Sequence, residues 1–172
     1  MTLVPELYCD DIYGITPEYI KGKGIEAVIL DIDNTLVPYE IAEPTEEVRA
    51  WLNALTEAGI KVAFVSNNHA DRVDKFNESL GFPAFPDSGK PFKRACNKAM
   101  EALGSKPENT AIIGDQVFTD VLAGRNAGLC AAFLVKPIKD KTNLFFKTKR
   151  LMEVPVLKKY KRMQKKKGDM GN

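Results

Sequence analysis

The sequence has few of the residues that support disulfide, thiolate or histidine chemistry. Its 172 residues include three cysteines and one histidine. Cys9, Cys96 and Cys130 are far apart and odd in number, which favours neither a disulfide framework nor a cysteine metal site. We therefore expect a protein of the reducing cytoplasm.

Long apolar runs are absent as well. The best uncharged apolar run, Gly128 to Val135, is far too short to span a bilayer. Residues Met1 to Asp11 have neither the basic nor the apolar region of a signal peptide, so we expect none. A chain of this length usually forms one domain, and a hydrophobic fraction of 44% suffices for its core.

The chain does contain an alternation of apolar runs and helical patterns. Strands are predicted at Ala27–Leu30, Lys61–Val65, Phe82–Pro86, Thr110–Gly114 and Leu129–Val135. Helices are predicted at Thr16–Gly22, Thr45–Ala58, Ala70–Leu80, Ala95–Leu103 and Phe118–Asn126. Most of the strands are continuously apolar, which is typical of a parallel sheet covered on both faces. We predict an α/β protein with three αβα layers, about five parallel strands and no substantial cap domain.

The charge is divided unevenly along the chain. Residues 136–172 hold 13 of the 25 basic and 3 of the 23 acidic residues, which gives this segment a net charge of +10. Residues 1–135 carry a net charge of −8. We divide the chain into an N-terminal extension (1–24), a core (25–135) and this C-terminal basic segment (136–172). We expect Leu144–Met152 to dock as a helix and Pro155 to interrupt it. Lys158–Lys167 would be a flexible tail, either solvated or in contact with an acidic membrane or RNA.

Polar residues follow four of the predicted strands. The carboxyl ends of parallel strands meet at one edge of a sheet, where ligands bind. Singly, these residues are typical of turns and helix caps, and an Asp-x-Asp pair fits a solvated turn as well as a metal site with a carboxylate nucleophile. Their joint placement favours a site. The residues are Asp31, Asp33, Ser66, Asn67, Lys90, Asp115 and Asp120.

These residues form a pattern that resembles the haloacid dehalogenase (HAD) superfamily over Ile25 to Val135. The four motifs of that superfamily match Asp31-Ile32-Asp33-Asn34-Thr35, Ser66, Lys90-Pro91 and Gly114-Asp115-x-x-x-x-Asp120. The resemblance implies a Rossmann-like HAD fold. Asn34, where many members have glycine, and the lack of cap insertions resemble the capless subclass IIIA. The stretch Val65–Asn68 is similar to the phosphatidylglycerophosphate phosphatase-like group.

The resemblance also implies catalytic roles. Asp31 would attack phosphorus and form an aspartyl-phosphate, and Asp33 would act as general acid and base. Mg²⁺ would be held by a side-chain oxygen of Asp31, by Asp115 and by the backbone carbonyl of Asp33. Asp120 would support these ligands from behind or bind the ion through water.

The remaining motif residues would bind phosphate. Ser66, Asn67 and Lys90 would hold the phosphoryl oxygens, and Asn34 and Thr35 would supply loop geometry and backbone donors. His69 could transfer protons or, as the start of a helix, touch the substrate at the mouth of the site.

The sequence thus predicts a Mg²⁺-dependent phosphomonoesterase. The expected substrate is the terminal phosphomonoester of phosphatidylglycerophosphate, with the basic segment on the inner face of the membrane. A soluble sugar phosphate, a nucleotide or a phosphoprotein stays open as the substrate. A weakly active nucleic-acid-binding module is the competing class, and the sequence leaves the oligomeric state open.

Overall fold

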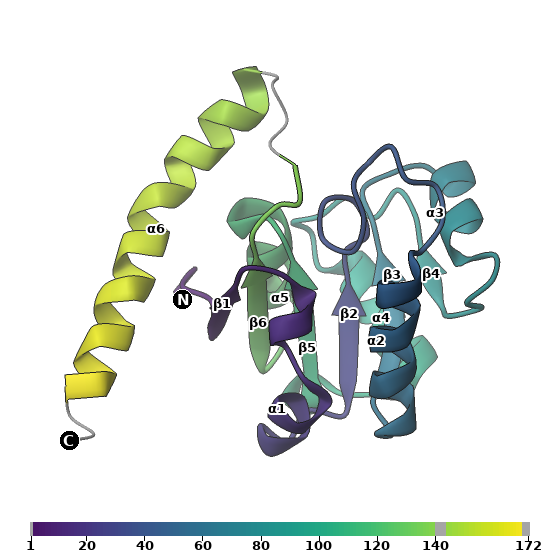
Figure 1. Cartoon of the computed structure of the whole chain (residues 1–172), viewed down its shortest axis with the longest axis horizontal. Coiled ribbons are helices and arrows are strands. Elements are labelled where there is room, and N and C mark those ends of the chain that lie inside the picture. Colours follow the sequence, from purple (N-terminus) through teal and green to yellow (C-terminus); the bar gives the residue numbers. More distant parts are fainter. Residues whose placement is uncertain (1, 140–143, 170–172) are drawn as a thin grey trace.

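The protein is built around one parallel sheet. The computed structural model describes residues 2–139 and 144–169. The sheet has six strands in the order β1-β6-β5-β2-β3-β4, and all of its neighbours are parallel (Figure 1). The strands are β1 (Leu7–Cys9), β2 (Ala27–Leu30), β3 (Lys61–Val65), β4 (Ala84–Phe85), β5 (Thr110–Gly114) and β6 (Ala131–Val135).

Helical segments connect the strands. The 3₁₀ and π turns are η1 (Ile12–Gly14), η2 (Pro107–Asn109) and η3 (Val117–Val121). The α-helices are α1 (Pro17–Gly22), α2 (Glu46–Glu57), α3 (Ala70–Asn77), α4 (Arg94–Leu103), α5 (Leu122–Asn126) and α6 (Leu144–Asp169). Thr16 and Thr45 cap α1 and α2 by accepting from backbone N–H groups, as expected for threonine at these positions. None of the described helices is both long enough and apolar enough to cross a membrane.

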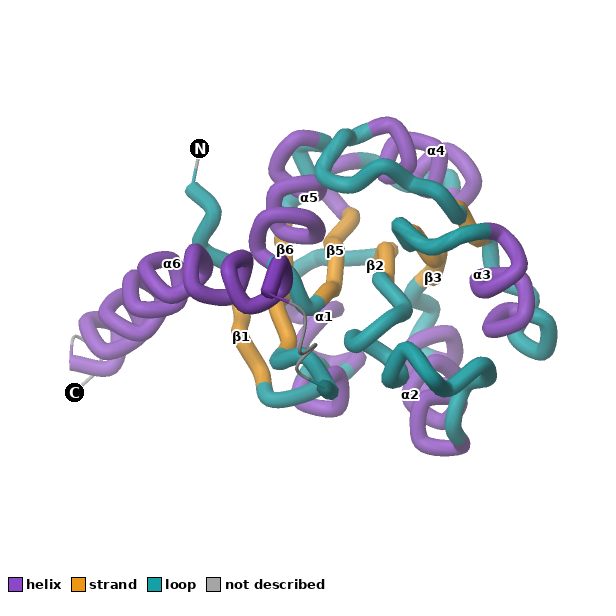
Figure 2. Tube along the Cα trace, turned by 90° about the horizontal axis from the view of Figure 1, so that it is seen from above, coloured by secondary structure: helices purple, strands orange, loops and turns teal. Residues whose placement is uncertain are grey.

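The two faces of the sheet carry separate hydrophobic cores. Successive side chains of a strand point to opposite faces. Val28 and Leu30 accordingly pack in a core with residues of α1, α2 and α3, while Ala27 and Ile29 pack with residues of α4 and α5. Figure 2 shows α4 and α5 on one side of the sheet and α1 and α2 on the other. The prediction of three αβα layers is confirmed, and the part of the chain that the structure describes contains no large cap.

The N-terminal extension contributes a sixth strand that the sequence did not predict. β1 pairs with β6, and Arg125 of α5 binds this segment through the Val4 carbonyl and the Glu6 carboxylate. β1 has three residues, too few to show a pattern. The predicted five strands all exist, although the third is reduced to Ala84–Phe85.

The C-terminal segment corrects the prediction that Pro155 ends its helix. We expected Pro155 to interrupt the helix, but α6 continues through it to Asp169, so the lysine-rich stretch expected as a flexible tail is helical. Proline removes one helical hydrogen bond, and docked residues on both sides of it hold the helix in place.

We also expected Leu144–Met152 to dock. Leu151 and Met152 are exposed, whereas Glu153, Val156, Leu157 and Tyr160 contact the rest of the protein. The side chains of residues 144–147, 149 and 150 lie outside the described residues, so docking of that part of the segment stays a prediction.

Candidate active site

The site begins where β2 ends. The Asp31 N–H donates to the Ile113 carbonyl of β5 at 3.0 Å, which extends the strand pairing by one residue. The chain then turns at Asn34, whose φ of +66° is a left-handed conformation that asparagine tolerates better than most residues. The Asn34 N–H donates to the Val37 carbonyl and closes the turn. Asn34 therefore shapes this turn. It is not among the residues that line the pocket described next, and its part in phosphate binding stays a prediction.

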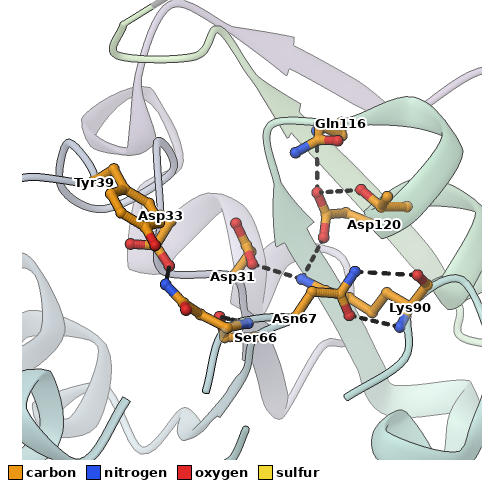
Figure 3. A pocket seen from close by; sticks show the side chains of 10 residues that line it. Asp31, Asp33, Tyr39, Ser66, Asn67, Lys90, Gln116 and Asp120 are labelled. Carbon is orange, nitrogen blue, oxygen red and sulfur yellow. Dashed lines mark hydrogen bonds and ion pairs between the residues drawn. The ribbon is translucent and has the colours of Figure 1, made fainter. Parts of the chain in front are cut away.

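A pocket of about 240 Å³ opens at the carboxyl edge of the sheet (Figure 3). The predicted site residues that line it are Asp31, Asp33, Ser66, Asn67, Lys90 and Asp120. Sequence reasoning did not identify its other lining residues, which are Tyr39, Asn68, Gln116 and Thr119. The convergence predicted from strand ends is therefore present in the structure.

Lys90 lies between two buried carboxylates. Its Nζ is 2.6 Å from Asp31 Oδ1 and 2.6 Å from Asp120 Oδ1, while the other oxygen of Asp31 accepts a hydrogen bond from the Thr35 hydroxyl. Burial alone would lower the pKa of Lys90, but the Asp120 and Asp31 carboxylates outweigh it and raise this pKa above its ordinary value. The ammonium group therefore stays charged in the site.

The environment of Asp31 is dominated by burial. Burial raises the pKa of Asp31 to about 7; Lys90 lowers this pKa, and the Asp120 and Asp115 carboxylates raise it. A cation beside this group would favour its ionised form. The site thus concentrates more negative charge than Lys90 balances.

Three carboxylates could hold a metal ion. Asp31, Asp115 and Asp120 are buried, and one oxygen of each lies within 4.8 Å of the others. An all-oxygen, carboxylate-rich donor set fits a hard divalent cation. The predicted ligands Asp31 and Asp115 are both in this cluster. Asp120, which was expected to support the ligands, is itself a member of the cluster. Metal binding by the Asp33 backbone carbonyl stays a prediction.

A glycine makes the Asp115–Asp120 arrangement possible. A Cβ atom on Gly114 would lie 2.3 Å from Asp120 Cγ, so no other residue fits there without displacing that carboxylate. Asp120 Oδ2 in turn accepts from the Gln116 N–H at 3.0 Å, which closes the loop after β5.

The Ser66 and Asn67 side chains are engaged within the protein. The Ser66 hydroxyl accepts from the Asn68 N–H, and the Asn67 side-chain oxygen accepts from the Lys90 N–H and the Ser88 hydroxyl. The Asn67 amide nitrogen donates to the Lys90 carbonyl. Asn67 therefore fixes the loop that carries Lys90, and phosphate binding by Ser66 and Asn67 stays a prediction.

Asp33 has partners different from those of Asp31. Its carboxylate lies 3.0 Å from Arg72 Nη2 and accepts from the Asn68 amide at 3.1 Å. Arg72 also donates to the carbonyls of Ile41 and Ala42 in the flap, residues 37–44, between β2 and α2. Sequence reasoning missed Arg72. Its position in the first turn of α3, directly after the Ser66 motif, places it at the same edge of the sheet and could have signalled it.

His69 lies at the start of α3, where a helix-start residue was expected. Its Nδ1 is 2.8 Å from Asp87 Oδ1, both side chains are largely exposed, and His69 is not among the residues that line the pocket. A role in proton transfer gains no support from this position.

Comparison with known proteins decides the family. The model of haloacid dehalogenase-like hydrolases matches residues 38–128. The chain is also 36% identical to a probable phosphatase, YqeG, of Bacillus subtilis (strain 168), over 92% of both chains. The chain belongs to the haloacid dehalogenase-like hydrolase family. It is an enzyme of the phosphatase type.

Two further relatives of this hydrolase differ in their named substrates. The pyrophosphatase PpaX of Halalkalibacterium halodurans is 33% identical over 54% of this chain and 47% of its own. The cobalt-bound structure of the deoxy-D-mannose-octulosonate 8-phosphate phosphatase of Haemophilus influenzae has a TM-score of 0.56 and 21% identity. It covers 80% of this chain and 90% of its own. The structural likeness concerns the fold of the hydrolase.

Proposed function

We propose that this hydrolase removes phosphate from a phosphomonoester through an aspartyl-phosphate on Asp31. The observation that carries the proposal is the placement of Asp31 in the pocket beside a charged Lys90, with Asp33 on the same wall. An Asp31 oxygen would attack phosphorus while the bond to the leaving oxygen breaks. Asp33 would give its proton to that oxygen, then take a proton from the water that attacks phosphorus and releases Asp31.

Mg²⁺ is the proposed metal, held by Asp31, Asp115 and Asp120 together with the Asp33 backbone carbonyl. A hard divalent cation fits this donor set, and when bound it would reduce the repulsion between an anionic nucleophile and an anionic phosphate. Lys90 adds a fixed positive charge where the transition state spreads negative charge. Ser66 and Asn67 would complete the phosphate site.

For the substrate we propose a phosphomonoester on a membrane lipid, phosphatidylglycerophosphate. We also propose that the chain belongs to the capless subclass IIIA. The pocket has no roof formed by a separate domain among the described residues, which suits a phosphate carried by a large object. The exposed side chains of α6 support a peripheral position on an anionic membrane. They are Lys158, Lys159, Lys161, Arg162, Lys165 and Lys166, together with the exposed apolar residues Leu151, Met152, Val154 and Met163.

Phosphate release across a substrate panel tests the proposal. The panel contains phosphatidylglycerophosphate in anionic vesicles, a sugar phosphate, a nucleotide, pyrophosphate and a phosphopeptide. We expect the lipid to have the highest kcat/KM with Mg²⁺ present. The named activities of the relatives favour a small soluble phosphate as the second candidate, and a higher kcat/KM on one of those compounds would select it.

Vesicle flotation tests the membrane contact separately. Surface lysines near an anionic leaflet are worth on the order of 1 kcal/mol each, and salt screens them. We expect flotation with anionic but not neutral vesicles at low salt. Replacing the six exposed basic residues of α6 by glutamine should abolish it while activity on a small soluble phosphomonoester is kept. Failure of the wild-type protein to float would contradict the membrane contact, and salt-dependent retention on RNA would favour the nucleic-acid alternative.

A further inference from the structure

Glu153 is a buried acidic residue on a helix whose other described charged side chains are basic. It lies in the third turn of α6, and its side chain is 2% exposed. One of its carboxylate oxygens accepts a hydrogen bond from the Val117 N–H at 2.8 Å. The proposed chemistry gives Glu153 no role, and a buried carboxylate is costly unless its oxygens are bonded.

Val117 occupies a critical place in the site. It begins η3, between Asp115 at the end of β5 and Asp120 within η3 itself. The first N–H groups of a helical segment have no partner inside the helix, and a carboxylate is a favourable acceptor for them. Glu153 therefore binds the backbone at the midpoint of the loop that carries two of the three clustered carboxylates.

A second observation places Glu153 beside the same loop. Asp115 and Glu153 both line a hollow of about 340 Å³ between α6 and the end of β6, which Leu157 and Val135 also line. Asp115 thus belongs both to the carboxylate cluster and to the lining of this hollow, which Glu153 of α6 also lines. In Figure 1, α6 runs along the β1 edge of the sheet, and none of its described side chains lines the catalytic pocket of Figure 3.

We propose that Glu153 is a positioning residue for the metal site: by accepting from Val117 N–H it holds the loop 115–120 so that Asp115 and Asp120 converge on Asp31. This inference rests on the proposed metal-dependent function. It makes α6 a part of the catalytic centre through the buried contact of Glu153, while the exposed side of the helix stays available to a surface.

The alternative is that Glu153 merely docks α6. A second, half-buried contact of the same helix separates these roles. The Tyr160 hydroxyl accepts from the Tyr8 N–H at 3.1 Å, and its ring packs edge-on against the Tyr8 ring of β1. Tyr160→Phe removes this hydrogen bond from the docked helix without touching the loop and is the matched control.

Calorimetric titration of Mg²⁺ into the folded full-length protein tests the proposal without any substrate. Loss of a group that orients metal ligands costs about 10- to 100-fold in metal affinity. We expect Glu153→Ala to raise the Mg²⁺ dissociation constant by at least about tenfold, and Glu153→Gln to restore most of it because its amide oxygen can accept the same hydrogen bond. Tyr160→Phe should leave it unchanged. Equal losses in Glu153→Ala and Tyr160→Phe, or a wild-type constant in Glu153→Ala, would overturn the proposal.

Val117→Pro removes the N–H donor of this hydrogen bond, whereas Glu153→Ala removes the acceptor. It replaces Glu153→Ala in the test if that variant does not fold. Proline fits the first position of a helical segment, and Gln116 before it has φ −125° and ψ 128°, which proline permits in its neighbour. Val117→Pro should weaken Mg²⁺ binding as Glu153→Ala does, and the double variant should be no weaker than either. Additive losses would overturn the proposal. If the wild-type protein binds Mg²⁺ but hydrolyses no phosphomonoester, the proposed function fails and the titration still decides the role of Glu153.

Discussion

At the scale of single residues, the two carboxylates of the first motif differ because their cations differ. Asp31 is paired with Lys90 inside the pocket, whereas Asp33 is paired with Arg72, which is also bonded to the flap. Two nitrogens of Arg72 contact Asp33 Oδ1 and the Asn68 amide donates to Asp33 Oδ2, so both carboxylate oxygens have fixed partners. Arg72 therefore couples the proposed acid–base group to the flap segment that bears Tyr39 at the rim of the pocket.

This pairing predicts the effect of Arg72→Ala. The variant should lower kcat on a small phosphomonoester by about tenfold or more, since a positioned acid or base contributes at least about a hundredfold. Arg72→Lys should recover part of the loss, because its charge can still pair with Asp33 but donors on a single nitrogen cannot match the spread of the guanidinium donors that also reach the flap carbonyls. Steady-state kinetics measures both effects.

Lys75→Ala is the control for Arg72. Lys75 lies on the same helix and pairs with Glu43 of the flap and with Glu78, but all three side chains are exposed, and such pairs contribute little. Equal losses of activity in Lys75→Ala and Arg72→Ala would show that the flap, and not the contact with Asp33, is responsible.

Lys90 makes a second prediction at this scale. Lys90→Ala should raise KM and lower kcat together, because the ammonium group attracts the phosphate in the ground state and more strongly in the transition state. The same variant leaves Asp31 and Asp120 without their shared cation, so it should also unfold at lower urea concentration than the wild type. Unchanged kinetics in a folded Lys90→Ala protein would remove Lys90 from the mechanism.

At the scale of elements, the end of β5 and the start of η3 form one unit around Gly114. Overpacking a filled interior costs about 1–3 kcal/mol. Gly114→Ala should lower the free energy of unfolding by roughly this amount and weaken metal binding, because its Cβ would displace the Asp120 carboxylate. Urea unfolding and metal titration measure the two effects.

Gly22→Ala is the control, because nothing lies within 4 Å of a Cβ atom built there. We expect it to leave metal binding unchanged. An equal loss of metal affinity in the two glycine variants would show that the close approach of Gly114 to Asp120 does not matter.

At the scale of the whole molecule, the sequence was most informative where local pattern and sheet topology agree. Continuous apolar strands that alternate with helical patterns predicted the layers. The rule that parallel strands end at one edge predicted the meeting of Asp31, Ser66, Lys90 and Asp120. No single pair of these residues would have been sufficient to predict the site.

Contacts between distant elements could not be predicted in this way. Glu153 reaches Val117 across 36 residues and Arg72 reaches Asp33 across 39, and neither helix pattern indicates which partner its polar side chain will meet. The prediction that Pro155 ends the helix failed for a related reason. The local preference of proline against helix is weaker than the tertiary contacts that hold α6 on both sides of it.

The central claim is that Asp31 forms a covalent bond with phosphorus. Protein quenched in acid during turnover with Mg²⁺, digested and examined by mass spectrometry, tests it most directly. We predict the added mass of a phosphoryl group on the Asp31 peptide, more of it in Asp33→Asn because breakdown of the intermediate slows, and none in Asp31→Asn, whose turnover should fall at least about a hundredfold. Near-wild-type turnover in a folded Asp31→Asn protein, with no phosphoryl group on Asp31 in any variant, would contradict the account.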